Sequence, residues 1–90
     1  MSAGAGPRLR LRVVTPRSPA VEAEAIEVSL PGTGGELGVL PGHRPLVAAL
    51  GRGPLRYRTD GGEENLLVRG GFADIRPERV LVFTELGDGD

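Results

Sequence analysis

The sequence predicts an all-β fold, a sandwich of two antiparallel sheets built from about ten short strands. Three observations support this prediction. Short runs alternate apolar and polar residues with a period of two. The 15 glycines and 8 prolines stand between these runs, as turn residues do between strands. No segment has the apolar spacing of a persuasive amphipathic helix. The alternation leaves one face of each strand apolar, so the core is expected between the two sheets.

The first strand is expected over residues 8–14, where Leu9, Leu11 and Val13 share one face and arginines the other. Prolines follow it. A second strand is predicted over residues 21–30, although a helix is the rival because Glu and Ala favour helices. Its apolar positions change phase near residues 25–26. A one-residue bulge there would keep all of them on the inner face.

Turn signals separate the remaining runs. A Pro-Gly pair closes the run over residues 37–40, an Asp-Gly-Gly sequence at 60–62 predicts a hairpin, and Gly70 and Gly71 predict a bend. The other predicted strands cover residues 46–50, 55–58, 66–68, 73–75 and 80–84.

Length and composition limit the possible functions. Ninety residues make one domain at most, which we expect over residues 8–86 between a flexible tail at 1–7 and a short acidic tail at 87–90. The chain has no cysteine, which excludes disulfides and thiolate zinc sites, and a net charge of -1, which argues against nucleic acid as a partner. No run approaches the roughly 18 apolar residues of a membrane span, and residues 1–7 lack the apolar core of a signal peptide.

The residues give no sign of catalysis. His43 is the single histidine, and no nucleophile or orienting group is visible near it in the sequence. The glycine-rich stretch 32–35 could suggest a phosphate-binding loop, but the chain has no lysine to reach the phosphates. We therefore predict no catalytic residue, no metal ligand and no cofactor.

Charged residues offer weaker candidates for contacts. Arg8, Arg10 and Arg12 form a stripe with period two, which is either a solvated edge or a basic strip for an acidic partner. The glutamates between residues 22 and 27 indicate a solvated face. Glu36 lies beside Leu37 in a glycine-rich turn, where an exposed charge is a candidate contact at a loop tip.

Several segments in order resemble one family. They are residues 11–16 (LRVVTP), 29–32 (SLPG), 35–43 (GELGVLPGH), 45–46 (PL), 55–57 (LRY), 70–72 (GGF) and 79–80 (RV). Together they resemble the N-terminal β-sandwich domain of the epsilon subunit of the F-type ATP synthase, called delta in mitochondria. The resemblance extends over roughly residues 8–85.

This resemblance implies a non-catalytic subunit of the central stalk. Its partners would be the gamma subunit and the membrane c-ring, and indirectly the alpha/beta head, and it would help couple proton flow to ATP synthesis. By resemblance, Glu36 and His43 face the c-ring or gamma, Leu37 accompanies Glu36, and Thr15 is a weaker gamma-side candidate. The implied location is peripheral, on the cytoplasmic face of the bacterial cell membrane.

Most relatives continue into an inhibitory C-terminal helical hairpin, whereas this sequence stops at Asp90. We therefore expect a short epsilon that couples but does not inhibit. One alternative is a stand-alone β-sandwich module that binds a small ligand or sugar, which would need aromatic side chains gathered on one surface. Alternation cannot place Tyr57, Phe72 and Phe83 together. A small hydrolase using His43 is a further alternative, but its hydrolytic constellation is missing.

Overall fold

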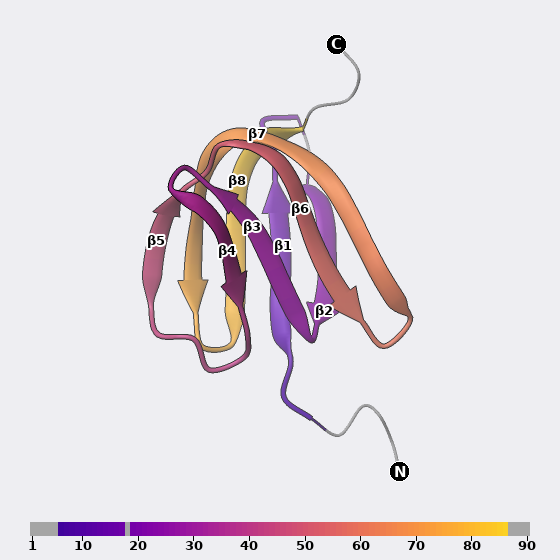
Figure 1. Ribbon diagram of the computed structural model, residues 1–90. Helices are drawn as coiled ribbons and strands as arrows, with labels where there is room; N and C mark the ends of the chain where they lie inside the picture. Colours follow the sequence, from indigo (N-terminus) through magenta and orange to yellow (C-terminus); the bar gives the residue numbers. More distant parts are fainter. Residues whose placement is uncertain (1–5, 18, 87–90) are drawn as a thin grey trace.

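The computed structural model describes residues 6–17 and 19–86, all of which form strands, turns or loops (Figure 1). The all-β prediction is confirmed. The eight strands are β1 (Leu9–Val14), β2 (Pro19–Ala25), β3 (Glu27–Gly32), β4 (Gly35–Val39), β5 (Leu46–Ala49), β6 (Arg52–Thr59), β7 (Gly62–Arg76) and β8 (Arg79–Leu86). Of the tails expected at 1–7 and 87–90, residues 1–5 and 87–90 lie outside the described residues.

Strand pairing follows the order β2-β1-β8-β7-β6-β3-β4, with β5 paired to β7. Every pair is antiparallel except β1 and β8, which run parallel. The path folds over on itself into two layers. The first layer comprises β2, β1, β8, the second half of β7 and β5, and the second layer comprises the first half of β7 with β6, β3 and β4.

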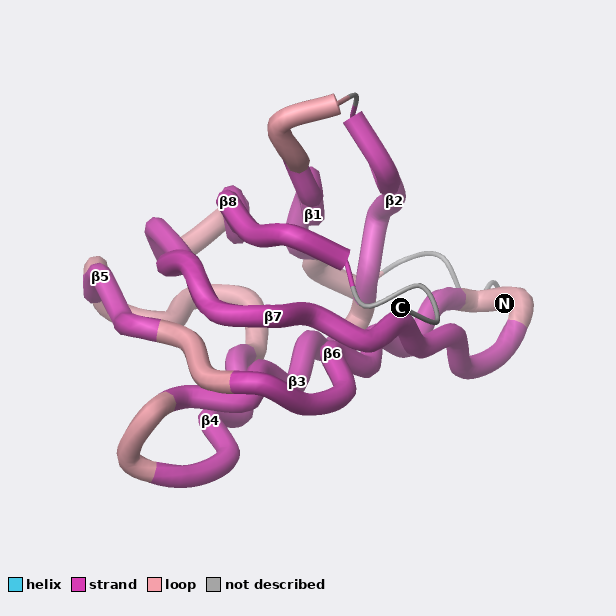
Figure 2. The backbone as a smooth tube through the Cα atoms, turned by 90° about the horizontal axis from the view of Figure 1, so that it is seen from above, coloured by secondary structure: helices cyan, strands magenta, loops and turns pink. Residues whose placement is uncertain are grey.

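Strand β7 belongs to both layers. Its residues 62–69 pair with β6, and its residues 68–69 and 72–76 pair with β8. Seen from above, β7 passes as one long tube beside both of these strands (Figure 2). The two runs predicted at 66–68 and 73–75 are therefore one strand, whereas the run predicted at 21–30 belongs to two strands, β2 and β3, and the described residues form eight strands in place of about ten.

The bend in β7 occurs at the predicted glycine pair. Gly70 and Gly71 have φ values of 73° and 96°, in the left-handed region that favours glycine, and the register with β8 shifts there. The buried hydroxyl of Thr84 donates to the carbonyl of Gly70 at 2.6 Å and accepts from the N–H of Arg69 at 3.2 Å. These bonds satisfy backbone groups that the bulge removes from the ladder.

The phase change near residues 25–26 has a different cause from the one predicted. Instead of a bulge within one strand, the chain turns a corner at Ile26 and passes from β2 in the first layer to β3 in the second. The N–H of Ile26 donates to the carbonyl of Arg58 at 2.7 Å. The inner face remains apolar because the odd-numbered residues of β2 from Val21 onward and the even-numbered residues of β3 point toward the core.

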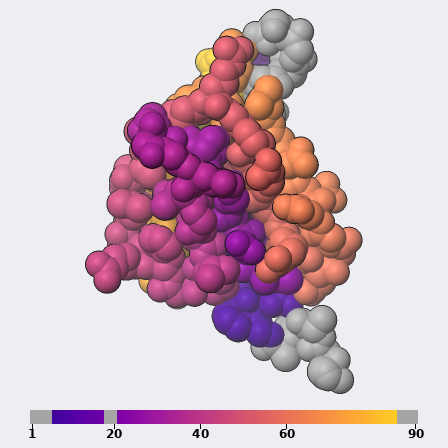
Figure 3. Space-filling view, viewed as in Figure 1, coloured from indigo at the N-terminus to yellow at the C-terminus, as the bar shows by residue number. Residues whose placement is uncertain are grey.

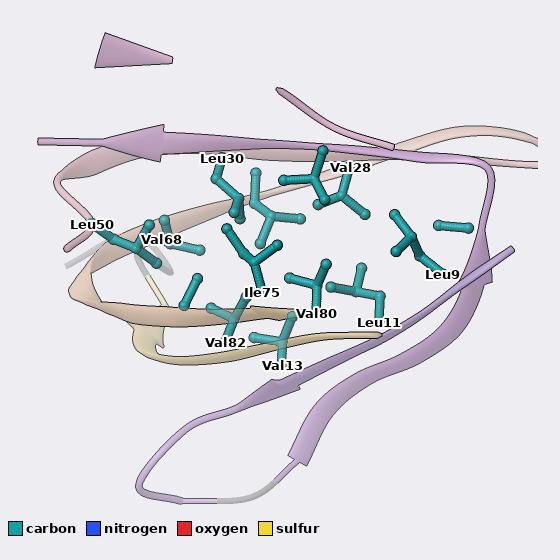
Figure 4. Packing of buried hydrophobic residues seen from close by; sticks show 14 residues of the cluster. Leu9, Leu11, Val13, Val28, Leu30, Leu50, Val68, Ile75, Val80 and Val82 are labelled. Atoms are coloured by element: carbon teal, nitrogen blue, oxygen red, sulfur yellow. The ribbon is translucent and has the colours of Figure 1, made fainter. Parts of the chain in front are cut away.

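The core fills the space between the layers (Figure 4). It is almost entirely aliphatic, so it contains few polar groups to satisfy. Its fully buried large side chains are Leu9, Leu11, Val13, Val28, Leu30, Val39, Leu55, Val68, Ile75, Val80 and Val82. Outside the core, Arg8 Nη2 contacts Asp60 Oδ1 at 2.9 Å and joins the start of β1 to the turn between β6 and β7.

Candidate docking surfaces

Glu36 was predicted at a loop tip, but it lies in strand β4. The turn comprises Thr33 and Gly34, and Glu36 is the second residue of β4. Its side chain is 64% exposed, yet Oε2 accepts a hydrogen bond from the hydroxyl of Ser29 and lies 3.6 Å from Nη1 of Arg56. Glu36 is thus a positioned carboxylate on the outer face of the second layer.

Leu37 points to the other side of the same strand. It lies opposite Leu30, is half-buried and packs against the core. Because neighbouring residues of a strand face opposite sides, Glu36 and Leu37 do not form one contact surface.

His43 ends a tight turn between β4 and β5. The φ of Gly42 is 91°, and its N–H donates to the carbonyl of Pro77 at 2.7 Å, which places this turn against the one between β7 and β8. His43 Nδ1 donates to the carbonyl of Arg44 at 2.7 Å. Among the described residues there is no group of His, Asp and Glu that could hold a metal ion.

Thr15 and His43 lie at opposite ends of the first layer. Thr15 directly follows Val14, the last residue of β1. Val14 belongs to the register row that also contains Phe83, Phe72 and Ala49. His43 belongs to the segment that joins β4 to β5, and this segment lies at the other end of the layer (Figure 1). The four predicted contact residues therefore lie at three separate places, with Glu36 and Leu37 sharing β4.

The outer face of the first layer carries an apolar surface that the sequence reasoning missed. We call it the apolar sheet face; it consists of Val14, Val47, Phe72, Leu81 and Phe83. Asp74, which is paired with Arg76, lies on the same face between Val47 and Leu81. Val47 is 66% and Phe72 46% exposed. The rings of Phe72 and Phe83 lie 5.0 Å apart between centroids. Both phenylalanines alternate out of phase with buried neighbours, which is the signal that could have revealed this surface.

A hollow of about 540 Å³ extends this surface at the end where Thr15 lies. Its lining includes Val14, Thr15, Phe72 and Phe83, with Arg69 and Glu85 as charged members. Thr15 is thus the one predicted contact residue that adjoins the apolar sheet face.

The outer face of the second layer is charged by comparison, and Figure 3 views the molecule from the side on which β3, β4 and β6 lie in front. Arg58 Nη2 lies 3.1 Å from Glu27 Oε1, and Arg56 is close to Glu36 as described above. Such exposed pairs contribute little to stability. They give this face a charge pattern in which opposite signs neighbour each other.

Tyr57 lies apart from the two phenylalanines. It is on β6, half-buried against the core, so the aromatic residues do not share a surface. Burial, and secondarily the charge of Glu64, raises the pKa of Tyr57 above its usual value of 10.0. Across residues 6–17 and 19–86 the structure has no helix long and apolar enough to span a membrane.

Comparison with known proteins gives a consistent result. Residues 8–86 match the family model described as "ATP synthase, Delta/Epsilon chain, beta-sandwich domain". The chain is 46% identical over 82 residues to an ATP synthase epsilon chain of Synechococcus sp. (strain WH7803), and 38% identical over 80 residues to that of Bacillus subtilis (strain 168). The aligned regions include 88% and 89% of this chain but 60% and 61% of those relatives.

Two solved structures share the fold. A chain in the Euglena gracilis mitochondrial ATP synthase, in a structure containing OSCP, F1 and c-ring, matches with a TM-score of 0.79 and 26% identity, covering 92% of this chain and 56% of that one. A chain from the central stalk/c-ring structure of the Tetrahymena thermophila enzyme matches with a TM-score of 0.70, covering 86% and 63%. Its identity is 13%, so that likeness concerns the fold alone.

Proposed function

The chain belongs to the ATP synthase delta/epsilon-chain β-sandwich family, and from this premise we propose that it is a non-catalytic, epsilon-type subunit of the central stalk of an F-type ATP synthase. It links the gamma subunit to the membrane c-ring and couples ion flow to ATP synthesis. The names of its relatives and its likeness to a chain of a c-ring assembly support this role. The chain lies at the membrane periphery, on the cytoplasmic face in a bacterium.

The apolar sheet face carries the proposal. Soluble domains that expose contiguous apolar side chains commonly use them to bind another protein. Here the rings of two phenylalanines contact each other in a tilted arrangement on the side of the domain that also carries Val47 and Leu81, and Phe72 and Val47 are substantially exposed. Aromatic side chains at the centre of an interface often provide most of its binding energy. We assign this face, with Thr15 at its end, to the gamma subunit.

The remaining predicted residues provide the other contacts. The His43 turn lies at the opposite end of the first layer, and Glu36 projects from the second layer, held by Ser29 and near Arg56. We assign both to the c-ring or to a second region of gamma. Leu37 acts through packing because it supports the strand that presents Glu36.

The packed core suits a subunit that transmits force. Each charge that crosses 100 mV releases about 2.3 kcal/mol, which reaches the catalytic head through the stalk. Close-packed interiors are nearly incompressible and transmit strain. Since β7 joins both layers, force on one layer reaches the other without a flexible linker.

Binding of the full chain to the gamma subunit encoded in the same genome tests this role. We expect Phe72→Gln to weaken binding by about tenfold or more, because it removes an aromatic anchor. The matched control is Leu67→Gln. Leu67 also belongs to β7 and is 45% exposed, against 46% for Phe72, but it lies on the outer face of the second layer. It should change the dissociation constant by less than about twofold. Failure of the unaltered chain to bind gamma, or equal losses in the two variants, would contradict the proposal.

A further inference from the structure

Three arginines lie side by side on the outer face of the first layer. Arg10 of β1 is the register partner of Arg79 of β8, which is also the partner of Arg76 of β7. Their neighbours Leu9, Leu11, Ile75 and Val80 are buried, so all three side chains point outward. We call Arg10, Arg79 and Arg76 the arginine row. Its members are spaced by about 5 Å, the distance between paired strands.

This arrangement is unfavourable for the isolated chain. Like charges directly opposite on neighbouring strands destabilise a sheet. Arg76 is compensated, since its Nε lies 3.0 Å from Asp74 Oδ1. In the described part of the chain, neither Arg10 nor Arg79 forms an ion pair.

The nearby carboxylates form no ion pair with these two arginines among the described residues. Glu24 is opposite Arg10 on β2, and Glu78 is in the turn before β8. Both line a hollow of about 320 Å³ together with Arg10 and Arg79, without pairing with them. Elsewhere on this face an arginine does find its partner, as Arg12 Nε lies 3.2 Å from Glu22 Oε2. Within the described residues, the guanidinium groups of Arg10 and Arg79 therefore have no ion-pair partner.

The row is continuous with the apolar sheet face. Along β8, Arg79, Leu81 and Phe83 alternate on the outer side, and Arg10 and Val14 do so along β1. Phe83 lies four positions after Arg79 along the strand, a distance of about 13 Å. A protein seated on the phenylalanines thus extends over the arginines without a change of surface.

We propose that the arginine row binds carboxylates of the protein that covers the apolar sheet face. This inference rests on the proposed function, in which that protein is the gamma subunit, and it names the chemistry of gamma's surface there: Asp or Glu side chains aligned with Arg10 and Arg79. Guanidinium groups bind carboxylates in a two-point geometry. An anionic membrane fits less well, because Glu24 and Glu78 beside the row would repel a continuous negative surface.

The test measures binding of full-length Arg10→Gln, Arg79→Gln and double variants to the gamma subunit at several NaCl concentrations. We expect each single variant to weaken binding a few-fold and the double variant about tenfold at low salt, with a shallower dependence on salt. The matched control is Arg52→Gln. Arg52 is also exposed and also opposite another arginine, Arg69, but lies in the second layer. It should leave affinity and salt dependence unchanged.

Unchanged affinity and salt dependence in the double variant, while Phe72→Gln still weakens binding, would overturn this inference and leave the proposed function standing. Failure of the unaltered chain to bind gamma would overturn the proposed function itself. The urea midpoint of the double variant should be unchanged or higher. A clear fall would mean that the arginines stabilise the folded chain, and it would contradict the inference. Vesicles of phosphatidylcholine with phosphatidylglycerol should not bind the chain through these residues. If the unaltered chain bound such vesicles, and the double variant lost this binding while it still bound gamma, the row would be a lipid site and the inference would be wrong.

Discussion

At the scale of single residues, Gly71 allows β7 to bend. Its φ of 96° lies in the region that side chains rarely adopt. A Cβ at this position would also lie 1.8 Å from the carbonyl oxygen of Phe83 and 2.9 Å from its carbon, both backbone atoms that cannot move aside independently. The bend and the close approach of β8 therefore both require glycine here.

Gly71→Ala should lower the free energy of unfolding by more than about 2 kcal/mol, because it combines a strained φ with a clash against backbone. The control is Gly38→Ala in β4, where an added Cβ meets nothing within 4 Å and φ is not positive. That change should alter stability by less than about 1 kcal/mol. Urea denaturation followed by far-ultraviolet circular dichroism measures both, and equal effects would show that the corner tolerates a side chain.

At the scale of elements, the hairpin of β6 and β7 places Tyr57 opposite Glu64 on its inner side. Burial is the larger cause of the raised pKa of Tyr57, and the carboxylate of Glu64 adds to it. The phenol therefore stays neutral in the folded chain at pH values where it ionises in the unfolded chain. Stability from this group is present below pH 10.0, the usual pKa, and is lost as the pH rises through the folded pKa.

Alkaline titration of tyrosinate absorbance measures this directly, because the chain has one tyrosine and neither lysine nor cysteine. The folded midpoint should lie above 10.0 and return to about that value in urea. Glu64→Gln should lower the midpoint in part, with burial keeping it above the usual value. Glu63→Gln, which neighbours Arg58 on the outer side, should leave it unchanged. A folded midpoint at or below the usual value would contradict the burial of Tyr57.

Alternation predicted which residues face the core but not where the chain changes layer. A bulge within one strand and a corner at Ile26 produce the same change of phase, so the sequence could not separate them. Alternation also carries no strand direction, which explains why the parallel pairing of β1 and β8 was not predicted.

The site shows the same limit. Glycines around Glu36 indicated a loop, whereas the turn ends at Gly34 and β4 begins at Gly35, which has a φ of 132°. The outward phase of Phe72 and Phe83 was present in the sequence. The contact between their rings depends on the pairing of β7 with β8. The glycine bend shifts the register of this pairing so that Phe72 lies opposite Phe83. The arginine row likewise appears only when three strands are aligned.

At the scale of the whole molecule, we expect the two layers to unfold as one cooperative unit. The first half of β7 pairs with β6 and its second half with β8, so one strand carries hydrogen bonds to both layers. Leu50 N donates to the carbonyl of Gly71 at 2.9 Å and Gly51 N to that of Pro31 at 2.8 Å, which joins the layers again beside the bend. The inner faces of both layers contribute to one core, so each layer buries its inner apolar face only against the other layer.

Val68→Ala tests this cooperativity. Val68 is fully buried in the half of β7 that belongs to the second layer. The loss of two methyl groups and the remaining cavity should lower the free energy of unfolding by about 2 kcal/mol. Native-state hydrogen exchange should report the same decrease for amides of β1 in the first layer as for those of β6 in the second. If β1 amides kept their original protection while β6 amides lost theirs, the layers would unfold separately, and a sandwich that transmits force as one body would be the wrong description.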